Sequence, residues 1–301
     1  MGTTNDAGDM PPEAKRHFQR LNRIFNIAGA VPEGDRIMTN IVNHKTPIFF
    51  TSFFELPKSL GEIRVFRDEN DRTKLNPDDA VIAVRNALSD AKQAALMVHE
   101  GRHLEQAGAQ VLNAPKRCSP EDYMWFQNMV EADAQATTAI VALKAKIAGD
   151  DSMFKSMAKR TGYANFPQMF RKAEELYKKD PTSIDTPEFK RQVFDTWFDN
   201  GSAVSRFLGL EDKNSYALKA IMDFPKWDKG CQKLNMPIEK LTAKDAEPIG
   251  VCGGEKVNYL TLPGFRPLDD PYYKKVNNIV LREIAKDQQS MWTWKNQPPK
   301  M

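Results

Sequence analysis

Cysteine and histidine are scarce in this sequence, and long apolar runs are missing from it. The three cysteines, Cys118, Cys231 and Cys252, lie far apart and form no CxxC pair, which argues against a disulfide framework and fits a reducing compartment. No stretch approaches the roughly 18 apolar residues that a membrane-spanning helix needs, and the N-terminus has no apolar segment typical of a secretory signal. We therefore expect a cytoplasmic protein with no membrane partner, although export by a system that needs no such signal stays open.

An excess of charge of one sign is also missing. The chain has 301 residues, with 43 Lys and Arg against 40 Asp and Glu, and the small surplus is spread along the sequence. Such a balance predicts no basic surface for nucleic acid. The content of 41% hydrophobic and 28% charged residues is typical of a globular protein, and the length allows one or two domains. The oligomeric state cannot be inferred from these numbers.

The first part of the chain combines one helical pattern with short strand patterns. We expect a helix at 12–29, closed by a glycine. Two aromatic, β-rich runs follow at 46–56 and 61–68, with a turn between them. A third candidate strand lies at 80–86, after a polar loop at 69–79.

Two longer helical patterns come next, and each begins after a serine suited to cap a helix. Ser89 precedes a helix that we expect to end near Gly108, and Ser119 precedes one that should reach about Gly149. The pattern stays helical from residue 150 onward, with candidate helices at 151–162, 166–179, 186–198, 215–224 and 270–289. The expected fold class is therefore α+β and mainly helical.

The residues suited to chemistry are concentrated in the run ALMVHEGRHLEQA at 95–107. His99 and His103 are four apart, so they share one face of a helix and can both reach one zinc ion. Glu100 lies about 100° further round the helix, where it can take a proton from a water that the zinc ion activates. The alternative is a pair of core histidines bonded to carbonyls or carboxylates.

A catalytic zinc site needs a third protein ligand. The next predicted helix offers Glu131, which follows His103 by 28 residues, and an antiparallel helix would place its carboxylate opposite the histidines. We expect Glu131 to be this ligand, with Gln135 on the same face as a candidate hydrogen-bond partner of a histidine. Asp133 is an alternative ligand, and both acids could instead be solvated on the helix surface.

These residues resemble the zincin metallopeptidases of the glutamate-ligand (gluzincin) type, whose motif is HExxH followed on a later helix by ExxAD. The run HEGRH at 99–103 matches the first part. Glu131 and Ala134 match the second part, but Gln135 stands where the family usually has Asp. The runs KLNP, VHEGRHLEQ and EADAQA are also similar to a bacterial family of proposed metallopeptidases with no assigned substrate. The resemblance covers about residues 63–140.

The resemblance implies a zinc-dependent peptidase that holds one Zn2+ per chain through His99, His103 and Glu131. Glu100 would be the general base and then the proton donor to the leaving amine. A small twisted sheet would pack on the active-site helix, and a second helix would deliver Glu131. The run at 80–86 would be the edge strand that binds an extended substrate, with a plain structural strand as the equally open alternative.

Composition and pattern suggest how the chain is divided. We expect residues 1–12, which are small and polar, to be a disordered tail. Residues 13–150 would form the zincin-like region, and 151–301 a helical region that is separate from the first or part of the same domain. The substrate would be a peptide or protein. The alternatives are a non-catalytic helical interaction protein stabilised by zinc, and a helical binding protein without metal.

Several other residues carry weaker signals. Gly101 is either a packing glycine or a point of close approach for another backbone or the substrate, and Arg102 with Glu105 is most simply a helix-surface pair. The run at 250–256 is interpreted as a turn. Spacing does not choose an oxyanion-stabilising residue among seven candidates, which are His44, Tyr123, Tyr163, Tyr216, Tyr259, Tyr272 and Tyr273.

Overall fold

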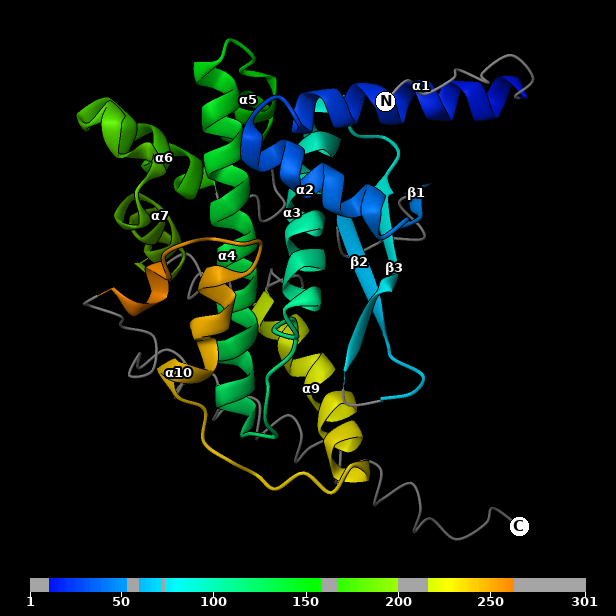
Figure 1. The fold of residues 1–301 in the computed structure, drawn as a ribbon, viewed down its shortest axis with the longest axis vertical. Helices are drawn as coiled ribbons and strands as arrows, with labels where there is room; N and C mark the ends of the chain where they lie inside the picture. Colours follow the sequence, from blue (N-terminus) through cyan, green and yellow to red (C-terminus); the bar gives the residue numbers. More distant parts are fainter. Residues whose placement is uncertain (1–10, 53–59, 72–73, 159–166, 200–215, 263–301) are drawn as a thin grey trace, which may run out of the picture.

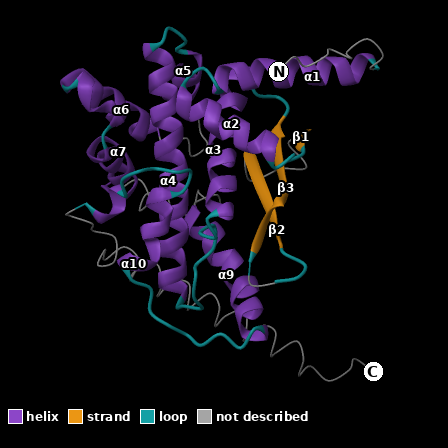
Figure 2. Ribbon diagram, viewed as in Figure 1, coloured by secondary structure: helices purple, strands orange, loops and turns teal. Residues whose placement is uncertain are grey.

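A computed structural model of the chain describes residues 11–52, 60–71, 74–158, 167–199 and 216–262. Within them the protein is mainly helical with one three-stranded sheet, which confirms the α+β class (Figure 2). Helix α3 (Asp90–Gly108) lies between the sheet and helix α4 (Pro120–Ile147), as Figure 1 shows. Among the described helices, none combines the length and apolar character needed to cross a membrane.

The sheet has the strand order β1-β3-β2, so the last strand in sequence lies in the middle. Strand β1 (Ile48–Thr51) pairs in parallel with one side of β3 (Leu75–Arg85), and β2 (Gly61–Arg67) pairs antiparallel with the other side. The strand predicted at 80–86 therefore exists, but the prediction that it is an edge strand is wrong. Within the described part of the chain, strands β1 and β2 are the edges of this sheet.

Strand β3 also begins earlier than predicted, at Leu75. Its first part contains Pro77 and two aspartates, which are typical of a loop because they fit a regular strand poorly. The pairing of β3 with β2 is irregular between Arg64 and Phe66. Such a bulge tolerates a proline within a strand, so the polar stretch can remain part of the sheet.

Two N-terminal helices pack on α3 (Figure 1). Helix α1 (Pro12–Ala28) begins at Pro12 and ends before Gly29, as predicted, and residues 1–10 of the expected tail lie outside the described residues. Helix α2 (Pro32–Asn43) was not predicted, although its buried residues recur at helical spacing: Gly34, Ile37, Met38 and Ile41.

Helix α2 crosses α3 at Gly101. A Cβ atom at this glycine would come within 2.4 Å of Ile37 Cγ2 and 3.0 Å of Ile41 Cδ1. The packing interpretation of Gly101 is therefore confirmed, since only a hydrogen atom fits between the two helices.

The two central helices begin at the predicted caps and run in opposite directions (Figure 1). Ser89 Oγ accepts a hydrogen bond from Lys92 N, and Ser119 Oγ accepts one from Asp122 N. Helix α3 is buried at every residue from 93 to 107. Its charged and polar side chains therefore need partners inside the protein.

Most of the later helices pack on α4. Helices α6 (Pro167–Lys179) and α7 (Pro187–Asp199) pack directly on it, and α9 (Tyr216–Lys233) packs near its N-terminal half through Tyr123. The predicted helix at 270–289 lies outside the described residues. The remaining described elements are α5 (Ser152–Ala158), η1 (Pro181–Asp185), α10 (Ala243–Ala246), η2 (Glu247–Val251) and η3 (Tyr259–Thr261).

A buried ion pair joins α3 to α4. Arg102 Nε and Nη2 donate to Asp133 Oδ2 and Oδ1 at 2.7 and 3.2 Å, and both side chains are fully buried. Arg102 Nη1 also donates to Glu105 Oε2 at 2.8 Å and to the carbonyl of Cys252. The prediction that Arg102 and Glu105 form a helix-surface pair is therefore wrong in its placement: the pair exists, but both residues are buried.

Other elements extend this ion pair into a network. Lys190 of α7 lies 3.2 Å from Asp133 Oδ1, and Glu255 lies 3.1 Å from Arg102 Nη2. Burial by itself would raise the pKa of Asp133, but Arg102 and Lys190 hold it well below its usual range, so the carboxylate is ionised. Arg36 of α2 pairs with Glu105 at the edge of the network.

The run at 250–256 packs directly against the arginines of this network. It forms a turn as predicted, with Gly253 at φ +83°. A Cβ atom at Gly253 would lie 2.2 Å from Arg36 Nη1 and 2.7 Å from Arg102 Nη1. The glycine therefore lets the backbone approach both guanidinium groups.

We expect Arg102→Met to lower the free energy of unfolding by about 3–5 kcal/mol, because it leaves Asp133 and Glu105 as buried charges with one partner fewer. Urea unfolding would measure the loss. Arg64→Met is the matched control, since Arg64 is 68% exposed and pairs with Glu62 at the surface, where such pairs contribute about 0–1 kcal/mol. Equal losses in the two variants would contradict the role assigned to Arg102.

Candidate metal centre

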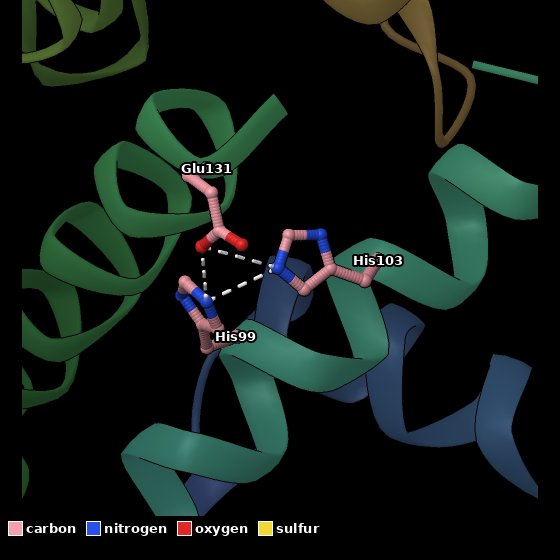
Figure 3. A group of neighbouring side chains, drawn as sticks. All are labelled: His99, His103 and Glu131. Carbon is pink, nitrogen blue, oxygen red and sulfur yellow. Dashed lines mark hydrogen bonds and ion pairs between the residues drawn. The ribbon is translucent and has the colours of Figure 1, made fainter. Parts of the chain in front are cut away.

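Three side chains from α3 and α4 converge, as predicted from the sequence (Figure 3). The Nε2 atoms of His99 and His103 lie 3.1 Å apart. Glu131 Oε2 lies 3.3 Å from His99 Nε2 and 3.6 Å from His103 Nε2. One helical turn separates the histidines, and the antiparallel α4 brings the carboxylate to the same point.

These distances fit a shared metal ion. Zinc bonds of about 2.0–2.2 Å in a tetrahedral arrangement place neighbouring ligand atoms roughly 3.3–3.5 Å apart, close to the three separations observed. Glu131 Oε2 is buried and accepts no hydrogen bond of good geometry within the described part of the chain. Two imidazoles and a carboxylate that face one point could hold a divalent cation.

The electrostatics of the centre also favour a cation. Burial by itself would raise the pKa of Glu131, but His103 and His99 hold it well below its usual range. Burial lowers the pKa of His103, whereas Glu131, Glu100 and the hydrogen bond to Gln106 raise it to about 8. The carboxylate is thus ionised, and the interpretation of Glu131 as a solvated surface acid is wrong.

The hydrogen-bond partner of a histidine is Gln106 rather than Gln135. His103 Nδ1 lies 2.6 Å from Gln106 Oε1, whereas Gln135 Nε2 is buried with no partner among the described residues. Gln106 follows His103 by three residues, so helical spacing could have identified it. Asp133, the alternative ligand, lies in the ion network and bonds Gln106 Nε2 at 2.9 Å.

Glu100 lies beside the histidines and against strand β2. Its side chain is buried, and its negative charge contributes to the raised pKa of His103. A Cβ atom at Gly61, the first residue of β2, would lie 2.9 Å from Glu100 Oε1. The start of β2 therefore packs directly on the carboxylate that would act as the base.

Three of the oxyanion candidates have described side chains, and each has another contact. His44 bonds Asp78, Tyr123 packs on Trp227, and Tyr259 donates to Asp133. Tyr259 is thus tied to the ion network. The other four candidates have side chains outside the described part of the chain: Tyr163, Tyr216, Tyr272 and Tyr273.

Comparison with known proteins agrees with this donor set. Residues 61–214, just over half of the chain, match a family model described as "Putative metallopeptidase family (DUF6782)". The matched range contains the whole of β2, α3 and α4, and with them the three converging side chains. No curated protein and no solved structure matches the chain. The match shows that the chain belongs to this family.

Proposed function

We propose that the protein is a zinc-dependent peptidase with an HExxH active site of the gluzincin type. The observation that carries this proposal is the convergence of His99, His103 and Glu131, whose ligand atoms have the spacing expected around a tetrahedrally coordinated ion. Glu100 directly follows the first histidine. Two histidines and a glutamate are a ligand set of catalytic zinc sites in peptidases. Membership of a family described as metallopeptidases supports the same reaction class.

In the proposed hydrolysis, Glu100 carries out the proton transfers beside the metal site. When bound, a zinc ion would polarise the scissile carbonyl and lower the pKa of water. Glu100 accepts a proton from the attacking water while the water oxygen bonds to the carbonyl carbon. Glu100 then donates this proton to the amide nitrogen as the C–N bond breaks, which leaves a carboxylic acid and an amine.

The sheet supports a peptide or protein as the substrate. Strand β2 is an edge strand, and its first residue packs on Glu100. An extended peptide can add to a sheet edge through backbone hydrogen bonds. Strand β2, rather than the predicted run at 80–86, is then the strand that would orient the scissile bond.

A non-catalytic zinc-stabilised protein is the second candidate, and the burial of the centre favours it. His99 is 7% exposed, and Glu100 and His103 are each 5% exposed. Structural zinc sites have four protein ligands, however, whereas catalytic sites keep one position open. Within the described residues three ligands converge, which supports the peptidase.

Elemental analysis of the purified protein should find one zinc ion per chain, and Glu131→Ala should lose most of it because the third ligand is removed. The matched control is Glu121→Ala, which changes a glutamate in the first turn of the same helix and should keep the zinc. Wild-type zinc content in Glu131→Ala would show that the ligand assignment is wrong.

We expect Glu100→Gln to keep its zinc but to lose hydrolysis by about 10²–10⁴-fold, since the amide cannot accept the proton of the water. The measurement is cleavage of a mixture of unstructured peptides, followed by mass spectrometry. Glu175→Gln, at an exposed position on α6, is the control and should cleave at the wild-type rate. An unchanged rate in Glu100→Gln would eliminate the catalytic role, and a zinc-loaded wild type that cleaves nothing would favour the non-catalytic candidate.

A further inference from the structure

We propose that Gln106, Asp133 and Tyr259 form a positioning relay that sets the tautomer of His103, so that the segment 247–262 completes the metal centre. The proposal rests on the metal site described under the proposed function. It extends that site to a part of the chain beyond the matched residues 61–214. None of the three residues is a ligand, and each acts on the ion only through His103.

The side-chain amide of Gln106 can have only one orientation. Gln106 Nε2 donates to the carbonyl of Val130 at 3.0 Å and to Asp133 Oδ2 at 2.9 Å. Both partners are acceptors, so the amide nitrogen must face them. The amide oxygen must then face His103.

This orientation determines where His103 carries its hydrogen. Gln106 Oε1 lies 2.6 Å from His103 Nδ1, and an amide oxygen can only accept. His103 Nδ1 must therefore carry the hydrogen, and the neutral ring has its lone pair on Nε2. Nε2 is the atom that faces His99 and Glu131 (Figure 3), so the relay selects the tautomer that can bind a metal.

Asp133 can orient Gln106 because its own position is held from several sides. Arg102 binds both of its oxygens, and the Tyr259 hydroxyl donates to Oδ1 at 2.7 Å. Lys190 Nζ lies 3.2 Å from the same oxygen. Every one of these contacts is a donor to Asp133, so the carboxylate stays an acceptor for Gln106.

The segment 247–262 contains Tyr259, which donates to Asp133, and the ring of Tyr259 also lies against Lys190, a second partner of Asp133. Tyr259 is fully buried, and Lys190 Nζ lies 4.6 Å from the centre of its ring. The same segment accepts hydrogen bonds from Arg102 through the carbonyls of Ile249 and Cys252. Residues far outside the HExxH helix therefore hold the relay in place.

The first test compares two buried glutamines on α3. We expect Gln106→Met to weaken zinc binding by about 10–100-fold, as measured by competition with a chelator, because His103 can then adopt the wrong tautomer. Gln93→Met is the matched control: Gln93 is equally buried on the same helix and donates to the carbonyl of Arg85 at 2.7 Å. It should lose thermal stability but bind zinc like the wild type.

The second test reads the tautomer itself in the metal-free protein. Nitrogen-15 NMR at a pH where a titration shows the His103 ring to be neutral should find hydrogen on Nδ1 in the wild type and a shift toward Nε2 in Gln106→Met. Wild-type zinc affinity and tautomer in Gln106→Met would overturn the relay. If the wild type binds no zinc but shows the expected tautomer, the proposed function fails while the relay stands.

The third test concerns the segment 247–262. Tyr259→Phe removes only the hydroxyl that donates to Asp133, and it should weaken zinc binding by a smaller factor than Gln106→Met. Tyr123→Phe is the control, because Tyr123 is a buried tyrosine that packs on Trp227 and Phe224. Equal zinc affinity in Tyr259→Phe and Tyr123→Phe would overturn the contribution of the segment.

Discussion

The buried ion pair between Arg102 and Asp133 is the contact on which the metal centre depends, because it sets the register between α3 and α4. Arg102 directly precedes His103, and Asp133 follows Glu131 by two residues. A slide of one helix by a single turn, about 5.4 Å, would break the ion pair and separate the carboxylate from the imidazoles at the same time. Leaving either buried charge without its partner would cost free energy, and this cost opposes any slide of the helices that would separate Glu131 from the histidines.

The charges around the centre show why a divalent cation suits it. The ion network contains three cations, Arg36, Arg102 and Lys190, and three carboxylates, Glu105, Asp133 and Glu255. These charges balance one another. Glu100 and Glu131 lie beside the histidines, and the negative charges of these two carboxylates raise the pKa of His103.

Local sequence signals predicted the parts of this site that depend on one helix at a time. The spacing of His99 and His103 needs only the period of a helix, and the caps at Ser89 and Ser119 need only the residues that follow them. Glu131 was predicted because one antiparallel helix is a simple return path. Helix α2 was missed although its apolar spacing was present in the sequence.

The wrong predictions concern contacts between elements. Arg102 and Glu105 have the spacing of a surface pair, but α3 is buried on all sides by the sheet, α2 and α4. The run at 80–86 has the composition of a strand, and composition does not tell a central strand from an edge strand. Gln135 was predicted to bond a histidine because it shares a helix face with Glu131, whereas the structure has Gln106 in contact with His103.

The sequence by itself determined the helical face that carries two imidazoles, the position of Glu100 next to them, and the caps that start both central helices. These features follow from the 3.6-residue period and from backbone groups within one turn. Only the tertiary structure decided which carboxylate meets the imidazoles, which residue orients His103, and that residues 247–262 contact the same network. Those contacts join residues up to 150 positions apart, and no local rule relates residues that far apart in the chain.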